Sequence, residues 1–167
     1  MKKTVLATFV LLFISLPFLS FAQTKIGYVS VDEIFALMPE TKKADENLAE
    51  FQNALQESYA QQEADLNAAF DKFIKDSLTM TPAVKEAKRK DLQSRVNEMQ
   101  KKPKEMNNTL ELEKEKQITP IREKLLATIK EVAKAMGYDH VLYKESALVF
   151  PAAADLTNAV KNKLGIK

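Results

Sequence analysis

Several residue types are scarce or absent in this chain. Of its 167 residues, none is cysteine, three are glycine and one is histidine. Without cysteine there is no disulfide to stabilise a small core, so stability must come from packing or from association with other chains. The glycines, Gly27, Gly137 and Gly165, lie too far apart to form a glycine-rich phosphate-binding loop.

Residue arrangements that carry out catalysis or bind metal are also missing. The single histidine, His140, falls in a predicted strand, where a structural role is far more common than a catalytic one. Asp and Glu are numerous, but they lie on predicted helix surfaces, without metal-ligand spacing or a histidine partner. The sequence therefore predicts a protein that is not an enzyme, with no catalytic residues, no metal site and no cofactor.

A long apolar run, Val5–Leu19, stands at the start of the chain and follows Lys2 and Lys3. It is short for a membrane span of about 20 residues. Small residues at Ser20 and Ala22 suit signal peptidase, so we expect a signal peptide at residues 1–22, cleaved after Ala22, rather than an uncleaved membrane anchor. No cysteine stands near the cleavage site to carry a lipid. The mature protein is expected to be exported and soluble.

Two apolar runs at helical spacing dominate the rest of the sequence. Both step by three or four residues, the repeat of a narrow helical seam. When they are paired antiparallel, the numbers of facing residues always add to 161 or 162. The outward run is Leu48, Phe51, Leu55, Tyr59, Gln62, Leu66, Phe70 and Phe73, and the returning run is Lys88, Leu92, Val96, Met99, Pro103, Met106 and Leu110. The constant sum predicts one long antiparallel helical hairpin.

The same sum places the tip of the hairpin at residues 79–82. Thr81 precedes Pro82 there, the pattern of a helix N-cap followed by a first-turn proline. Pro103 lies inside the returning arm, where the missing backbone donor predicts a bend rather than a break. We therefore expect a coiled-coil arm at residues 40–120.

Charge is unevenly distributed along this arm. Residues 40–78 carry nine acids and four lysines, whereas residues 72–104 carry ten bases and four acids. Cleavage after Ala22 would leave a formally neutral mature chain, with 23 bases and 23 acids. The pattern fits an ordinary solvated helix surface, and it also fits a positive distal end that attracts anionic partners or an anionic membrane surface. Nucleic acid is not an expected partner of an exported protein without aromatic residues among these bases.

Short strand patterns stand at both ends of the mature chain. Residues 25–31, 139–143 and 147–150 are rich in strand-forming side chains. The hairpin returns the chain to its starting point, so these strands can meet in one small sheet.

Helical patterns accompany the strands. Ser30 and Glu33 predict a capping box at the start of a short helix. A second amphipathic helix is expected to stop at Gly137, and a last helix to run from a cap at Asp155 to a stop at Gly165.

The resulting fold class is α+β, mostly α, with residues 23–39 and 121–167 forming a small β-body. Such a body has too small a core to be stable alone. Association through its strands would also cover open sheet edges. The residues expected in this contact are Ile26, Tyr28, Val29, Val141, Leu142, Tyr143, Leu148 and Val149.

Both ends of the mature chain carry a recognisable pattern. The segments KIGYVSVDEIFALMPETKKA and PIREKLLATIKEVAKAMGYDHVLYKESALVFPAAADLTNAVKNKL resemble the Skp/OmpH family of periplasmic chaperones. The resemblance implies a periplasmic homotrimer in which a small β-body carries three helical-hairpin tentacles around a cavity. It also implies that unfolded outer membrane proteins are held there, without ATP, before membrane insertion. The best-known member is strongly basic overall, whereas this mature chain is neutral and only its tip is positive.

We therefore expect an ATP-independent holdase whose tentacle tip and inner surface contact clients. The residues expected to contact clients are Met80, Lys85, Lys88, Arg89 and Arg95. Met80 is included because it lies at the tip, with no expected seam partner, and because flexible methionine adapts to varied surfaces. The alternative is a structural coiled-coil spacer or adaptor that binds one folded envelope protein through its tip.

Overall fold

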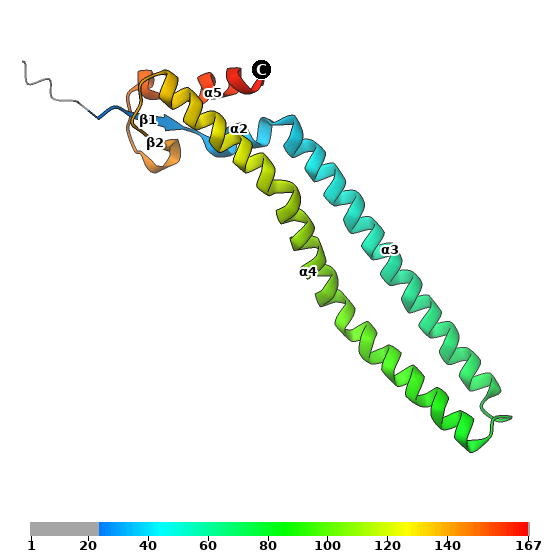
Figure 1. The fold of residues 1–167 in the computed structure, drawn as a ribbon. Helices are drawn as coiled ribbons and strands as arrows, with labels where there is room; N and C mark the ends of the chain where they lie inside the picture. Colours follow the sequence, from blue (N-terminus) through cyan, green and yellow to red (C-terminus); the bar gives the residue numbers. More distant parts are fainter. Residues whose placement is uncertain (1–23, 167) are drawn as a thin grey trace, which may run out of the picture.

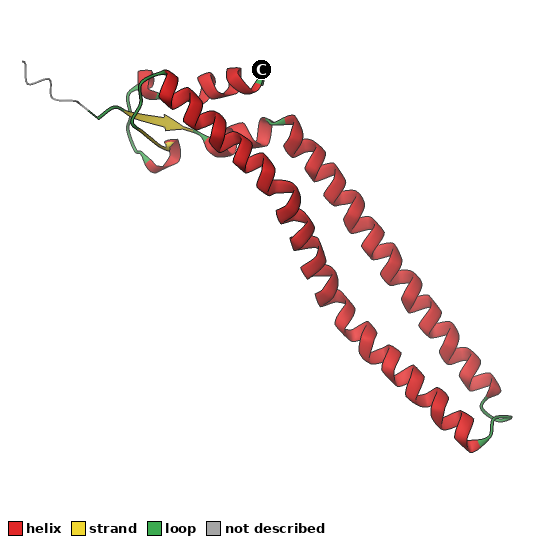
Figure 2. Cartoon of the chain, viewed as in Figure 1, coloured by secondary structure: helices red, strands yellow, loops and turns green. Residues whose placement is uncertain are grey.

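A small body and a long helical hairpin make up the computed structural model, which describes residues 24–166. Figures 1 and 2 show the two long helices projecting together from a cluster of short elements that contains the C-terminus. In chain order the elements are β1 (Ile26–Val29), α2 (Val31–Leu37), α3 (Pro39–Asp76), α4 (Pro82–Ala135), β2 (His140–Tyr143), the 3₁₀ turns η1 (Lys144–Ser146) and η2 (Ala152–Ala154), and α5 (Thr157–Leu164). The predicted fold class is confirmed.

The hairpin consists of α3 and α4, and the predicted seam lies between them. Leu92 is buried, and most other apolar residues of the two runs are half-buried. Gln62, Lys88 and Pro103 remain exposed. Two helices share only one stripe, so most seam side chains keep one flank open to solvent. The seam therefore holds the arms together and still presents apolar surface along its sides.

The tip of the hairpin has the predicted chemistry. Thr81 is the N-cap of α4, its side chain accepts a hydrogen bond from the Val84 N–H, and Pro82 is the first helical residue. Pro103 and Pro120 both lie within α4, which continues unbroken to Ala135. Figure 1 shows this helix bowed along its length. One helix therefore extends from the tip of the arm into the body.

The body contains a two-stranded parallel sheet. Ile26 of β1 pairs with His140 of β2, and the register continues to Val29 and Tyr143. The helical hairpin provides the long crossover that parallel strands require. On its other edge, β1 makes a single bridge from Tyr28 to Asp155.

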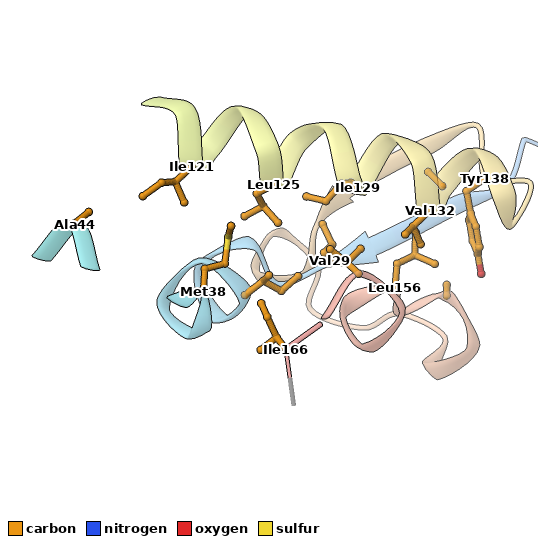
Figure 3. Packing of buried hydrophobic residues seen from close by; sticks show 14 residues of the cluster. Val29, Met38, Ala44, Ile121, Leu125, Ile129, Val132, Tyr138, Leu156 and Ile166 are labelled. Carbon is orange, nitrogen blue, oxygen red and sulfur yellow. The ribbon is translucent and has the colours of Figure 1, made fainter. Parts of the chain in front are cut away.

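The core lies between this sheet, the last turns of α4 and helices α2 and α5. Figure 3 shows Leu125, Ile129 and Val132 of α4 facing Val29 and Leu156. Gly27 allows this close packing, because a Cβ atom there would lie 2.8 Å from Leu156 Cδ1. Burial of large apolar side chains, each worth about 1.5–3 kcal/mol, stabilises the body.

The predicted third strand is wrong. Residues 147–150 form no strand and connect the two 3₁₀ turns. A strand needs a partner for its backbone groups, but β1 already pairs with β2 on one edge and meets Asp155 on the other. Inside one protomer, this segment has no strand edge of β1 left to join.

Two predicted caps also differ from the structure. Ser30 is the N-cap residue of α2, but its hydroxyl donates to the Glu145 carboxylate instead of capping the helix. Helix α5 begins two residues after Asp155, whose Oδ1 accepts from the Thr157 N–H at 2.9 Å. The predicted stops at Gly137 and Gly165 are confirmed, with φ of 70° and 72°.

Candidate binding surfaces

A hollow opens beside the seam near the tip of the hairpin. Its volume is about 280 Å³, and its apolar lining includes Phe73 and Leu92. Three of the predicted contact residues, Met80, Lys88 and Arg95, line it as well. Met80 is half-buried here, so the expectation that it has no seam to fill is wrong.

A second hollow continues the first along the arm. It measures about 190 Å³, contains Leu66 and Met99, and shares Arg95 with the hollow at the tip. We call the two together the seam groove, lined by Gln62, Asp65, Leu66, Ala69, Lys72, Phe73, Asp76, Met80, Lys88, Asp91, Leu92, Arg95, Glu98, Met99 and Lys102. Apolar residues and charges of both signs surround it, so it can accept an apolar side chain without selecting a strongly charged partner.

The remaining predicted contact residues lie outside the seam groove. Arg89 pairs with Glu86 on its own helix at 3.0 Å, and both side chains are largely exposed. Lys85 is half-buried near the start of α4. The structure therefore brings together Met80, Lys88 and Arg95, but not Lys85 and Arg89. An exposed ion pair such as Arg89–Glu86 is worth little in stability.

Sequence reasoning missed exposed apolar residues at the tip. Leu78 is 92% exposed, Ile74 is 65% exposed and Val84 is about half exposed. These apolar residues belong to neither of the two apolar runs. The sequence therefore signalled their exposure, because no facing residue was expected to cover them. They give the positive end of the arm an apolar component.

Sequence reasoning also missed a basin on α4 nearer the body. It has a volume of about 710 Å³ and is lined by Asn108, Glu111, Leu112, Lys114, Glu115, Ile118, Thr119 and Arg122. All of these residues belong to one helix, so the basin lies along one face of α4. Pro120 lies in the same stretch, and a proline inside a helix lacks a backbone donor and crowds the preceding turn. Leu112 is 68% exposed there.

The residues predicted for association of the body divide into two groups. Val29 is 2% exposed and belongs to the protomer's own core, so it is not available to another chain. Tyr28 and Val141 are half-buried against that core. The exposed members are Ile26, Leu142, Tyr143, Leu148 and Val149. Exposed apolar groups gathered on one small body are typical of an interaction surface.

An apolar pocket lies between the sheet and α4, and we call it the body pocket. Its volume is about 440 Å³. Val31, Leu126, Ile129, Val141 and Leu142 are among its lining residues. The side chains of Leu126 and Leu142 remain about half exposed in the described protomer.

Polar contacts hold the segment between β2 and α5 in place. Lys144 pairs with Asp155 at 2.8 Å, which joins the two ends of the segment. Lys144 Nζ also lies 5.5 Å from the centre of the Phe150 ring, and that ring lies 5.1 Å from the ring of Tyr28. Residues 147–150 are therefore fixed at both ends although they form no strand.

These contacts shift the pKa values of the groups involved. Burial acts to raise the pKa of Asp155, but hydrogen bonds from Lys144 and Thr157 outweigh it, so the net pKa is lowered. The Ser30 hydroxyl and a backbone hydrogen bond lower the pKa of Glu145. The hydrogen bond to Asp155 raises the pKa of Lys144.

Acid is therefore expected to loosen the body. A carboxyl group with a lowered folded-state pKa stabilises the fold above its ordinary pKa, and this contribution is lost as the pH falls through the folded-state value. The raised Lys144 pKa leaves its contribution intact until strongly alkaline pH. Urea unfolding between pH 7 and pH 3 should show that Asp155→Asn reduces the acid dependence. Glu57→Gln, at an exposed arm residue, should leave the acid dependence unchanged. If the free energy of unfolding varies with pH equally in both variants, this role of Asp155 is contradicted.

Within residues 24–166, the structure shows no cluster of three His, Cys, Asp or Glu side chains that could hold a metal ion. His140 is exposed at the start of β2. In the same residues, no helix is both long and apolar enough to cross a membrane. The predicted signal peptide at residues 1–22 lies outside the described residues.

Comparisons with known proteins agree on one family. The family described as "Outer membrane protein (OmpH-like)" matches residues 25–164. A solved structure of a candidate outer membrane chaperone (OmpH-like) from Caulobacter crescentus is similar in fold, with a TM-score of 0.71 at 19% sequence identity. That match covers 86% of this chain and 85% of the other. Among curated proteins, no sequence matches significantly.

Proposed function

Because the chain belongs to the OmpH-like family, we propose that it is a periplasmic chaperone that holds unfolded outer membrane proteins and prevents their aggregation. The observation that carries this proposal is the open-sided arm. Its apolar seam is only half-buried, a groove lies beside the seam, and a basin lies on α4 nearer the body. The proposed role needs no catalytic group, no cofactor and no ATP.

Holding an unfolded chain requires many weak contacts. A membrane-barrel strand presents alternating apolar side chains with no fixed arrangement, so a single deep pocket would fit few of them. The seam groove, the basin near Leu112 and the exposed Leu78 distribute apolar contact sites along the arm. Weak contacts at several linked sites multiply in effect while each remains easily broken. Met80, Lys88 and Arg95 would act within the groove, and Lys85 and Arg89 at its outer end.

The proposal includes assembly through the body. A small core with several exposed apolar residues favours association with further copies. Family membership supports a homotrimer, in which three arms would surround a shared cavity. Of the residues predicted for this contact, Ile26, Leu142, Tyr143, Leu148 and Val149 are exposed in the protomer.

The tip also suits transient contact with an anionic membrane surface. Exposed Leu78 and Ile74 lie beside Lys75, within the region where bases outnumber acids. Lysines near an anionic surface contribute about 1 kcal/mol each, and exposed apolar residues add to this. Export to the periplasm would follow cleavage of the signal peptide after Ala22.

The test is suppression of aggregation. A urea-denatured outer membrane barrel protein is diluted into buffer containing the mature protein, and light scattering is recorded without ATP. We expect scattering to fall to near zero once the chaperone assembly equals the client in concentration. Unchanged scattering at that ratio, together with tight binding to one folded envelope protein, would favour the adaptor alternative instead.

A further inference from the structure

The outward helix of the arm carries charge of one sign over most of its length. Between Ala44 and Asp71, α3 has seven acids and no base. Helix α4 mixes the two signs and pairs them along its own surface, as Arg95 does with Asp91 at 3.3 Å. Within residues 24–166, none of the seven α3 acids makes an ion pair. A solvated helix gains stability from opposite charges three or four residues apart, so these acids forgo that gain and remain free for another partner.

The side chains that point away from the seam define two outer faces of the arm. With about 3.6 residues per turn, a side chain two positions from a seam residue points away from the partner helix. Glu57, for example, stands two positions from both Leu55 and Tyr59. The outer face of α3 includes Glu46, Glu50, Glu57, Ala64, Asp71 and Lys75, all exposed. The outer face of α4 includes Glu86, Lys90, Asn97, Lys104, Glu111 and Glu115, also exposed.

These two faces would meet at equal heights if copies of the chain surrounded one axis. In the hairpin, where α3 and α4 run side by side (Figure 1), residues whose numbers add to 161 lie at the same height along the arm. Rotation of a copy about a central axis leaves that height unchanged. A cyclic assembly also brings two different surfaces of neighbouring copies together. The outer face of α3 on one copy can therefore meet the outer face of α4 on the next.

Opposite charges coincide in height along the distal half of the arm. The pairs at equal height are Glu57 with Lys104, Asp71 with Lys90, and Lys75 with Glu86. The sign changes at Lys75 on one face and at Glu86 on the other, although Glu86 also pairs with Arg89 of its own helix at 3.0 Å. Between these pairs the small Ala64 lies level with the longer Asn97. Complementary charges orient two surfaces and fix their register.

Like charges coincide in height nearer the body. Glu46 lies level with Glu115, and Glu50 lies level with Glu111. Like charges placed opposite each other disfavour contact. Neighbouring arms would therefore be held apart near the body and drawn together farther out, which leaves the space between them widest near the body.

We propose that neighbouring arms of the assembly contact each other along their distal halves, with the outer face of α3 on one copy against the outer face of α4 on the next. This contact rests on the assembly included in the proposed function, and it closes the sides of the cavity. Exposed ion pairs are individually weak, so the contact adds little to the stability of each chain and can open to admit a client. Salt opens it, because the Debye length falls from about 30 Å in about 0.01 M salt to about 3 Å in about 1 M.

Cysteine pairs test this contact, since the chain has no natural cysteine. Ala64→Cys and Asn97→Cys are placed on separate chains of different mass, which are refolded together from urea and oxidised in low salt. A disulfide requires Cα atoms within about 7 Å, so the product reports close approach of two arms. Relative to the number of such pairs, crosslinks between Ala64→Cys and Asn97→Cys should exceed those between two Ala64→Cys chains at least about threefold, and should fall by a similar factor in high salt. Equal yields of the two products, or a yield that salt does not change, would overturn the proposal.

Charge reversal tests the electrostatic cause of the contact. Glu57→Lys with Asp71→Lys should reduce the crosslink at least about threefold, and Lys90→Glu with Lys104→Glu should do the same. Combining all four changes restores opposite charges at equal height and should restore the yield. Asp45→Lys with Glu63→Lys makes the same change in net charge on exposed residues of α3 outside its outer face, and should leave the yield unchanged. A fourfold variant that stays as poorly crosslinked as either double variant would contradict the proposal.

Solution mass and suppression of aggregation separate this inference from the function on which it rests. The crosslink in a protein that fails to suppress aggregation would remove the holdase proposal and leave the contact in place. An assembly that suppresses aggregation but gives no preferred crosslink would remove the contact alone. A solution mass of one chain would remove the assembly and the contact together.

Discussion

Replacing Leu156 with alanine is expected to lower the free energy of unfolding of the body by about 2–5 kcal/mol, the usual cost of a large-to-small change in a core. Leu156 is fully buried. Its backbone N–H donates to the Tyr28 carbonyl at 2.7 Å, and its side chain packs on Gly27. The change would leave a cavity where α5 meets β1, and the close packing at Gly27 limits how far the walls can collapse.

Urea unfolding followed by tyrosine fluorescence would measure this loss. Of the four tyrosines, Tyr28, Tyr138 and Tyr143 lie in the body, so the signal reports mainly on it. The matched control is Leu112→Ala, the same change at an exposed residue of α4, expected to cost less than about 0.5 kcal/mol. Both variants must be measured at the same chain concentration, because association stabilises the folded state. Similar losses for the two variants would show that the body core does not extend to Leu156.

Removing the distal part of the arm is expected to weaken chaperone activity strongly without affecting the body. The constant sum of facing residues indicates which segments can be removed together: deleting 60–73 and 88–101 retains the native turn and the seam register. The arm would lose about 21 Å of length at 1.5 Å per residue, and with it most of the seam groove. Because linked weak sites multiply in effect, the concentration needed for half-suppression should rise at least about tenfold.

A second deletion of equal size separates the groove from arm length. Removing 45–58 and 103–116 shortens the arm equally and retains the seam groove, but it removes Leu112 and most of the basin nearer the body. Light scattering with the same denatured client should show stronger suppression for this variant than for the first. The solution mass of both should match that of the full-length mature protein. If the two deletions weaken suppression equally, the seam groove contributes no more than the basin and the reach of the arm.

The hairpin could be predicted because each of its two arms carries its own run of apolar residues at helical spacing. Each run defines its own apolar stripe, and the two stripes match in only one antiparallel register. The tip followed from Thr81 and Pro82, and the helix stops from Gly137 and Gly165. All of these are short-range requirements of the backbone.

The groove beside the seam could not be predicted in the same way. Periodicity shows which residues face the partner helix, but not how much of each side chain the partner covers. Met80 therefore seemed free at the tip, although the returning arm half-buries it beside Phe73 and Leu92. Arg89 seemed equivalent to Arg95, but only Arg95 lines the groove.

The sequence by itself determined a long antiparallel hairpin, the position of its tip and a small body formed by the two chain ends. Only the tertiary structure decided which apolar residues of that body are buried within one protomer. Val29 and Leu148 follow similar local patterns, but β1 lies between β2 and the segment before α5, whereas residues 147–150 pair with neither strand of the sheet. The physical reason is that a strand depends on hydrogen bonds from residues distant in sequence, while a helix satisfies its own backbone. The same cause leaves Leu148 and Val149 exposed and makes them the surface that we propose a second copy covers.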